Sequence, residues 1–310
     1  MSASVSLRGL TRRYGGDTAL DALTFEVAAG ELFGIVGPDG AGKTTTLRML
    51  AGVLPPSAGD AFIDGISVAR EPERVKPRIA YMSQRFGLYE DLTVAENIAF
   101  YADLYRVPRA DRPARLERLY RFSRLQPFRD RLAGQLSGGM KQKLGLSCAL
   151  VHQPGVLLLD EPTFGVDPIS RRELWLILHE MVSAGLTAVV STSYLDEAER
   201  CDRVALLDGG RLIALDSPAA LQRSLPGELL AVRTPDPRRA RDVLRASPLV
   251  RRATLFGDTV HVLLERPGSA ADAVRAALAG AGVAVHDIEA IEASLEDVFL
   301  DLTSRPGAAA

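Results

Sequence analysis

The sequence contains no apolar run of about 18 residues, the length that a bilayer-spanning helix needs, so we predict no transmembrane helix. It also lacks a basic and apolar leader that ends in small residues, and we therefore expect no secretory signal. Cysteine is scarce: Cys148 and Cys201 lack the spacing of metal ligands, which favours two reduced thiols in a cytosolic protein. Neither sign of charge dominates, since 37 Lys and Arg residues stand against 39 Asp and Glu residues. This balance gives no overall electrostatic reason to bind nucleic acid or an anionic membrane.

The chain does have the length and apolar content for one large domain and a small one, with 310 residues of which 47% are hydrophobic. Short strand-like segments come first, residues 90–150 have a helical pattern, and strands then alternate with helices. Residues 156–159 are apolar on both faces, as a central strand of a parallel sheet must be. This order predicts an α/β fold with a parallel sheet.

A second unit is predicted after Ser217 and Pro218, where the composition changes. Strand patterns at residues 229–233, 252–256, 260–265 and 283–288 alternate with helical patterns at residues 238–246 and 270–278. The resulting β-α-β-β-α-β order is that of a small ferredoxin-like α+β domain. The unit carries no phosphate or metal motif, so we predict a regulatory or dimer-supporting role for it.

A phosphate-binding loop is predicted at residues 37–44, which read GPDGAGKT and match G-x-x-x-x-G-K-[ST]. Its three glycines let backbone N–H groups turn toward phosphate oxygens. Lys43 is expected to reach the β- and γ-phosphates, and the Thr44 hydroxyl to bind Mg²⁺. The alternative is a chance glycine-rich turn, and the predicted strand before the loop and helix after it argue against that.

Two adjacent carboxylates follow the apolar strand at residues 156–159. Asp160 is expected at the carboxyl edge of the sheet, where it can hold the Mg²⁺ shell. Glu161 is placed to act as general base toward the attacking water. Strands often end in solvated acids, so the acid pair alone indicates little. It is informative here because it occurs together with the phosphate loop.

A third motif, LSGGMKQ at residues 136–142, places a serine and two glycines at a predicted helix start, whose free N–H groups suit a phosphate. Alone it would indicate only a capped helix. Combined with the two preceding motifs, it resembles the LSGGQ-type signature of ABC ATPases. The resemblance covers about the first 220 residues, with every motif in family order.

The resemblance implies a P-loop NTPase fold, with a RecA-like core, an antiparallel β subdomain and a helical signature subdomain at about residues 87–152. It implies an ATPase domain at residues 1–222, followed by the ferredoxin-like domain at residues 223–310. ATP and Mg²⁺ are the implied ligands. In this family two ATPase domains pair head to tail, and each ATP lies between the phosphate loop of one and the signature of the other. Closure of the pair drives the membrane subunits.

The resemblance also implies roles for individual residues. Tyr14 resembles the aromatic residue that stacks on adenine, Gln84 resembles the glutamine that contacts Mg²⁺ and the catalytic water, and Asp167 belongs to a loop that crosses the dimer interface. The implied catalytic residues are Glu161, Gln84 and Ser193, and the implied Mg²⁺ ligands are Thr44, Gln84 and Asp160. The implied ATP contacts are Tyr14, Gly37, Pro38, Asp39, Gly40, Ala41, Gly42, Lys43, Thr44, Thr45, Ser137, Gly138, Gly139 and Asp167.

Two positions depart from the family pattern. The family usually has asparagine where Asp39 stands, so a negative charge is expected close to the triphosphate. Ser193 occupies the position of the family's switch histidine, within the run STSY at residues 191–194. A hydroxyl can donate a hydrogen bond but cannot carry the positive charge of an imidazolium toward the γ-phosphate.

The runs GPDG and STSY together resemble the N-terminal ATPase half of duplicated bacterial multidrug-export ATPases of the ABC-2 type, and the run SLEDVFL at residues 294–300 is typical of the same group. This implies an ATP-hydrolysing exporter subunit. Its implied partners are membrane-spanning permease subunits and a second ABC ATPase domain, from the same chain or a distinct one, and not nucleic acid. The implied location is cytoplasmic and peripheral, on the inner face of the cell membrane.

Two alternatives stay open. A catalytically impaired regulatory subunit would lend its signature to a partner's ATP; Ser193 and Asp39 favour this, and Glu161 argues against it. A soluble ABC ATPase acting on ribosomes or DNA is disfavoured, because the chain has one ATPase unit, no basic linker and no heptads.

Overall fold

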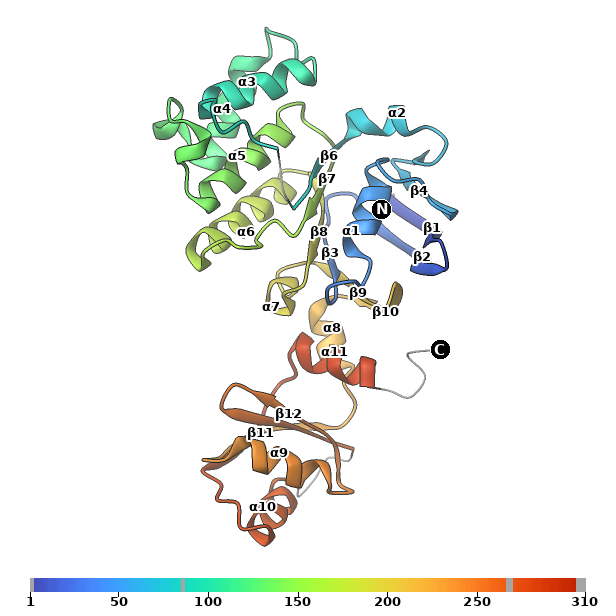
Figure 1. The fold of residues 1–310 in the computed structure, drawn as a ribbon, viewed down its shortest axis with the longest axis vertical. Coiled ribbons are helices and arrows are strands. Elements are labelled where there is room, and N and C mark those ends of the chain that lie inside the picture. Colours follow the sequence, from blue (N-terminus) through green and yellow to red (C-terminus); the bar gives the residue numbers. More distant parts are fainter. Residues whose placement is uncertain (1–2, 85–86, 266–269, 305–310) are drawn as a thin grey trace. The chain divides into compact units, whose positions relative to one another are not determined.

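Two units with separate hydrophobic cores make up the chain, one over Met1–Pro218 and the other over Ala219–Ala310 (Figure 1). The computed structural model describes residues 3–84, 87–265 and 270–304. Within these ranges, no helix is both long enough and apolar enough to cross a bilayer.

A six-stranded sheet forms the centre of the first unit. Across the sheet the strands are β10 (Arg211–Asp216), β9 (Arg203–Asp208), β3 (Leu32–Val36), β8 (Thr187–Thr192), β7 (Val156–Asp160) and β6 (Ile79–Met82). Only β10 is antiparallel to its neighbour in this sheet. Strands β3, β7 and β8 are buried throughout, as parallel strands covered on both faces are. Residues that follow these strands therefore meet at one edge of the sheet.

An antiparallel sheet completes the predicted β subdomain, with the strand order β2 (Asp17–Ala28), β1 (Ala3–Tyr14), β4 (Ala58–Ile63) and β5 (Ile66–Ser67). Helix α1 (Lys43–Leu50) contacts strands of both sheets, and one continuous core contains apolar residues from all three. Figure 1 shows α1 between the two sheets. The phosphate loop, which precedes α1, is thus anchored on packed elements.

Helices occupy most of the remainder of the first unit. They are α2 (Pro72–Val75), α3 (Val94–Leu104), α4 (Arg112–Ser123), α5 (Gly138–Leu150), α6 (Pro168–Ser183) and α7 (Leu195–Ala198), with 3₁₀ turns at Lys76–Arg78, Gln126–Phe128 and Ala133–Gln135. Helices α3, α4 and α5 pack together as a helical lobe. Thr93 caps the start of α3 and forms a capping box with Glu96. The helical pattern predicted for residues 90–150 is confirmed.

The second unit is a four-stranded antiparallel sheet with helices. Its elements are α8 (Pro218–Arg223), β11 (Glu228–Arg233), α9 (Pro237–Arg245), β12 (Val250–Phe256), β13 (Thr259–Leu264), α10 (Ala270–Gly280), β14 (Asp287–Ala290) and α11 (Leu295–Ser304). From β11 to β14 the order is β-α-β-β-α-β, and the strands lie in the order β12-β13-β11-β14. This is the arrangement of a ferredoxin-like domain.

The last strand of this unit was predicted at residues 283–288, and that position is wrong. The strand β14 starts at Asp287, because its pairing with β11 runs from Arg233↔Asp287 to Leu230↔Ala290. The apolar residues that suggested an earlier start serve the core instead: Val283 is buried in the turn after α10, where its N–H donates to the Leu278 carbonyl at 2.9 Å.

Helix α11 is fixed to the sheet by a polar cluster around the fully buried Asp297. One carboxylate oxygen accepts from His261 Nδ1 of β13 at 3.0 Å, and the other accepts from the Ser294 hydroxyl at 2.7 Å. Arg252 of β12 donates to the Asp297 carbonyl at 2.7 Å. Burial raises the pKa of the Asp297 carboxyl, but the hydrogen bonds from His261 and Ser294 outweigh it and hold the pKa below its ordinary 3.8.

Asp297→Asn should destabilise the second unit by about 1–3 kcal/mol at neutral pH, because it leaves buried donors without their charged acceptor. A carboxyl with a lowered folded-state pKa stabilises the fold above its unfolded pKa and loses that effect as pH falls. The difference between wild type and variant should therefore shrink below about pH 4. Hydrogen exchange of β13 in the full chain measures this, with the exposed Asp272→Asn as control. Equal protection in wild type and Asp297→Asn at pH 7 would show that the cluster does not hold α11.

Candidate functional site

The phosphate loop connects β3 to α1 and ends at Gly42. The φ of Gly42 is +98°, in the left-handed region that favours glycine. A Cβ here would lie 2.4 Å from Leu20 Cδ2 and 2.9 Å from the Ala19 carbonyl oxygen. Glycine is thus required by both backbone conformation and space, and the loop is packed tightly against β2.

Lys43, the first residue of α1, has a side chain that is only 4% exposed. Its ammonium donates to the carbonyl oxygens of Gly37 at 2.7 Å and Pro38 at 3.1 Å. It also forms an ion pair with Glu161 Oε1 at 3.2 Å. The positive charge is therefore held inside the curve of the loop, beside the acid that directly follows β7.

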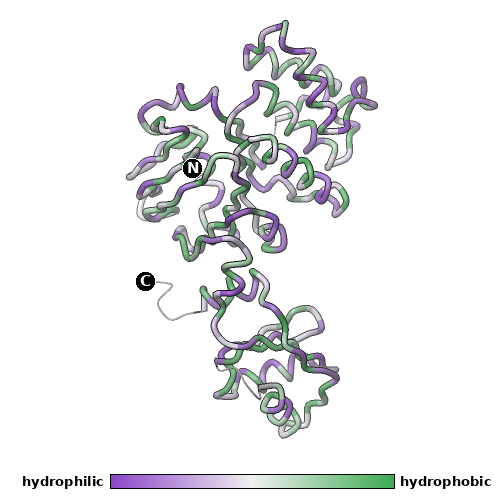
Figure 2. Tube along the Cα trace, turned by 180° about the vertical axis from the view of Figure 1, so that it is seen from behind, coloured by the Kyte–Doolittle hydropathy of each residue, from purple (hydrophilic) through white to green (hydrophobic). Residues whose placement is uncertain are grey.

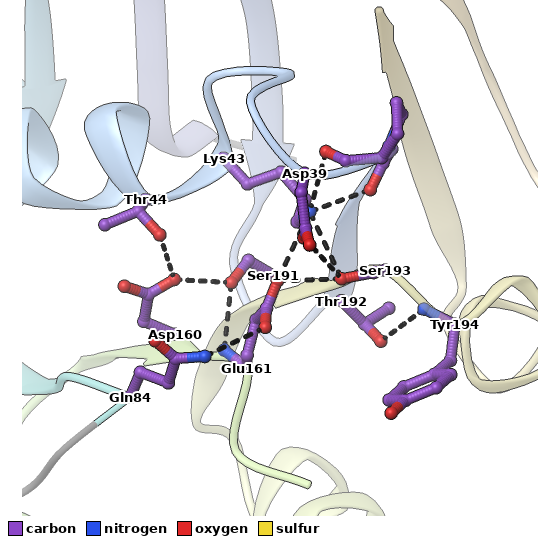
Figure 3. Close-up of polar contacts among 12 residues, drawn as sticks. Asp39, Lys43, Thr44, Gln84, Asp160, Glu161, Ser191, Thr192, Ser193 and Tyr194 are labelled. Carbon is purple, nitrogen blue, oxygen red and sulfur yellow. Dashed lines mark hydrogen bonds and ion pairs between the residues drawn. The ribbon is translucent and has the colours of Figure 1, made fainter. Parts of the chain in front are cut away.

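Thr44 and Asp160 are joined directly. The Thr44 hydroxyl donates to Asp160 Oδ1 at 2.9 Å, and the buried Ser191 hydroxyl donates to the same oxygen at 2.8 Å (Figure 3). Tyr81 of β6 donates to the other oxygen at 3.4 Å. Burial and the nearby Asp160 raise the pKa of Tyr81 above 10, so its hydroxyl stays protonated and remains a donor. Helix α1 and the two strands that flank β7, namely β6 and β8, thus orient this carboxylate.

Glu161 follows β7 with a φ of +46°, a conformation that is uncommon for a residue with a side chain. Its N–H donates to the Ser191 hydroxyl at 3.0 Å, which holds this backbone position. Its side chain accepts from Gln84 Nε2 at 3.2 Å and from the Ser193 hydroxyl at 2.9 Å. The carboxylate therefore lies between Gln84, two residues beyond β6, and Ser193, which directly follows β8 (Figure 3).

Ser193 lies among charges of both signs. Besides the bond to Glu161, its hydroxyl lies 3.4 Å from Lys43 Nζ and 3.5 Å from Asp39 Oδ1. Asp39 thus brings a second carboxylate to the same side chain. The two positions that were predicted to depart from the family pattern are therefore neighbours in space.

A cavity of about 520 Å³ opens over these residues, within the range of roughly 300–1,000 Å³ typical of ligand sites. Its lining residues are Ala19, Asp39, Gly40, Ala41, Gly42, Lys43, Thr44, Thr45, Gln84, Glu161 and Phe164. The structure therefore brings most of the phosphate loop together with Gln84 and Glu161.

Other residues implied as ATP contacts do not belong to the described lining of this cavity. Tyr14, at the end of β1, is 47% exposed, with the Arg12 guanidinium 4.6 Å from its ring centroid. Ser137 caps α5, accepting from the Met140 N–H at 3.3 Å. Asp167 caps α6, accepting from the N–H groups of Ile169 and Ser170. The hydrogen bond from Ser170 is the main reason why the pKa of Asp167 is lowered.

Sequence reasoning missed Ser191, Ala19 and Phe164. Ser191 has only a weak signal in the sequence, as a polar residue near the carboxyl end of an apolar strand, because the β7–β8 register decides that it lies next to Asp160. Ala19 and Phe164 have none, because the folding of β2 and of the loop after Glu161 decides that they face the cavity.

Known proteins that are similar to this chain point to the same family as the geometry of the site. The ABC transporter family profile matches residues 20–164. The probable multidrug ABC transporter ATP-binding protein YbhF of Escherichia coli K12 is 43% identical over 309 residues, which are 98% of this chain and 53% of that protein. The chain therefore spans about half the length of this relative. The Nod factor export ATP-binding protein I of Paraburkholderia xenovorans is 38% identical over 98% of both chains.

Solved structures show the same fold. The ATP-binding subunit of an ABC transporter is 32% identical, with a TM-score of 0.64 over 72% of this chain and 92% of that one. A dimeric ATP-binding cassette bound to ADP and Pi is 26% identical, with a TM-score of 0.62 over 69% of this chain and 98% of that one. The family predicted from the motifs is confirmed: this chain belongs to the ABC transporter ATP-binding proteins, a family of ATP-hydrolysing subunits.

Proposed function

We propose that this chain binds and hydrolyses Mg-ATP in the cavity over its phosphate loop and so powers an ABC-2 type exporter. The observation that carries the proposal is that one cavity is lined by residues of the phosphate loop, including Lys43, and by Gln84 and Glu161. Such a site offers phosphate binding and water activation side by side. The names of the multidrug and Nod factor export relatives support an export role.

Glu161 is the proposed general base. Its carboxylate is 13% exposed and is oriented from opposite sides by Gln84 and Ser193. Lys43 is the proposed phosphate ligand, because its ammonium is already turned into the loop and can exchange carbonyl oxygens for phosphate oxygens.

The oxygen atoms beside the loop fit Mg²⁺, which prefers hard oxygen ligands. The Thr44 hydroxyl and Asp160 Oδ1 are 2.9 Å apart, and we propose them, with Gln84, as the protein ligands. Among the described residues, no group of three or more His, Cys, Asp or Glu side chains could hold a metal by itself. This agrees with an ion bound chiefly through one carboxylate, waters and substrate phosphates. When bound, Mg²⁺ would neutralise charge on the phosphates.

The remaining implied contacts fit a head-to-tail pair. We propose that Tyr14 stacks on adenine, that the signature residues Ser137, Gly138 and Gly139 face a partner's ATP, and that Asp167 lies at the dimer interface. The signature residues do not belong to the described lining of their own chain's cavity, which supports this arrangement. So does the dimeric form of the similar cassette bound to ADP and Pi.

The proposed partners are membrane-spanning permease subunits on other chains and a second ABC ATPase domain, with no nucleic acid. The proposed location is cytoplasmic, on the inner face of the cell membrane. We further propose that the ferredoxin-like unit supports or regulates the dimer.

A regulatory subunit with a weakened site of its own is the second candidate function. It is favoured by Ser193 and Asp39, which place a hydroxyl and a carboxylate beside Lys43 and Glu161. Such a chain would still offer its signature to a partner's ATP.

Lys43→Ala is the direct test of nucleotide binding in this cavity. Loss of a charge-assisted hydrogen bond to phosphate should weaken ATP affinity by about 10- to 100-fold. Binding of a fluorescent ATP analogue measures it, with Lys76→Ala as control, since Lys76 is paired with Glu73 and does not belong to the described lining of the cavity. Equal affinities of wild type and Lys43→Ala would place the nucleotide elsewhere.

A further inference from the structure

Glu197, in the short helix α7, is a buried carboxylate outside the cavity and is only 1% exposed. Its Oε2 accepts two hydrogen bonds, from the Thr163 hydroxyl at 2.7 Å and from the Thr192 hydroxyl at 3.0 Å. The two threonines lie in different segments, one in the loop after β7 and the other at the end of β8. A single oxygen therefore joins two segments that are distant in sequence.

The other oxygen of Glu197 forms an ion pair with Arg171 Nε of α6 at 3.3 Å. The Arg171 guanidinium in turn lies over the Tyr194 ring, 4.6 Å from its centroid. Tyr194 also contacts Thr192 of the same cluster, because its backbone N–H donates to the Thr192 hydroxyl at 3.0 Å. Charge and hydrogen bonds thus connect the carboxylate to α6 and to the segment after β8. The Arg171 side chain is 27% exposed, so the pair is buried on the Glu197 side only. Removal of Arg171 would leave the buried Glu197 charge without its ion-pair partner, which is unfavourable.

Both segments held by Glu197 lead directly to Glu161. Thr163 is two residues beyond it, and Thr192 directly precedes Ser193, whose hydroxyl donates to Glu161 Oε1 at 2.9 Å. Figure 3 shows Thr192, Ser193 and Glu161 side by side in this arrangement. The backbone of Glu161 has a φ of +46°, and such a conformation persists only where its surroundings hold it.

We propose that Glu197 is a positioning residue for ATP hydrolysis, which fixes the loop after Glu161 and the Ser193 segment relative to each other. This inference rests on the proposed function, since it assigns Glu161 the role of base. Glu197 acts through the two threonines and Arg171, and its own carboxylate does not belong to the described lining of the cavity. Loosening it should move Glu161 relative to the phosphate loop without removing any group that binds nucleotide.

Thr163→Val is the mildest test, because it removes one connection and keeps the shape of the side chain. We expect kcat to fall about tenfold or more, with nucleotide affinity and binding stoichiometry unchanged. Glu197→Gln should act in the same direction, and the double variant should fall no further than the larger single change, because both act through one cluster. The matched control is Thr187→Val, which removes a buried hydroxyl at the other end of β8, where it accepts from the Gly30 N–H at 3.0 Å.

Steady-state phosphate release and fluorescent-nucleotide titration of the full chain decide between the outcomes. Unchanged kcat in Thr163→Val and Glu197→Gln would overturn the inference. So would a loss of turnover that matches a loss of nucleotide-binding stoichiometry, since that pattern indicates misfolded protein only. A wild type that hydrolyses no more ATP than Lys43→Ala would instead overturn the proposed function itself.

Discussion

Glu161→Gln is expected to slow ATP hydrolysis by about 10³-fold, the scale of a lost general base, while ATP binding persists. The amide keeps the size and hydrogen-bonding reach of the side chain but cannot accept the proton of the attacking water. It also removes the negative charge that now lies 3.2 Å from Lys43 Nζ, which leaves the ammonium free for phosphate. ATP should therefore bind at least as tightly, and a dimer closed on ATP should accumulate.

Phosphate release measures the first effect and size-exclusion chromatography with ATP measures the second. Glu180→Gln is the matched control, because it makes the same change at an exposed position of α6. Turnover of Glu161→Gln equal to that of wild type would exclude Glu161 as the base. Slow turnover without any ATP-dependent dimer would keep the base but contradict the proposed pairing.

The parts of the site that could be predicted from sequence are those set by short-range geometry. The phosphate loop needs glycine at Gly42 because of a left-handed backbone and the contact with Leu20, and such a requirement leaves a motif in the sequence. Asp160 ends an apolar strand and Glu161 follows it, and parallel strands bring their carboxyl ends to one edge. Strand, loop and acid pair were therefore predictable from the sequence.

Residues that act through contacts between distant segments could not be predicted in this way. Ser191 orients Asp160 and the Glu161 backbone only because β7 and β8 pair in one particular register. Glu197 bonds Thr163 and Thr192 across the chain, and its own neighbours in sequence suggest only a helix. The start of β14 was predicted too early for the same reason, because pairing with β11 decides where this strand begins.

Gly138 and Gly139 of the signature are adjacent in sequence, but the space around them differs. A Cβ at Gly139 would lie 2.2 Å from the Ser170 side chain, so any substitution there disturbs the packing of α5 on α6. A Cβ at Gly138 would meet nothing within 4 Å. A variant meant to block a partner's phosphate without harming its own fold should therefore be made at Gly138.

The second large effect is expected at Ser193, where we propose that serine replaces the switch histidine: Ser193→His should raise ATP turnover of this chain by about 10²- to 10³-fold. Ser193 lies within 3.5 Å of Asp39, Lys43 and Glu161, so in the proposed site a side chain here would lie beside the phosphate and the attacking water. Its hydroxyl can position Glu161 but brings no positive charge, and Asp39 adds a negative one. An imidazolium would restore a donor and a charge at the place where negative charge develops.

The measurement is steady-state hydrolysis at saturating Mg-ATP for wild type, Ser193→His and Ser193→Asn. The asparagine variant is the matched control, because it adds a polar side chain of intermediate size that cannot be protonated. The ratio of the histidine variant to wild type should be larger at pH 6 than at pH 8, because an imidazole with a pKa near 6.5 loses its charge across that range. A pH-independent gain shared by both variants would assign the effect to size alone. Brisk wild-type turnover that histidine fails to increase would show that the serine site is fully competent, and the regulatory candidate would then lose its support.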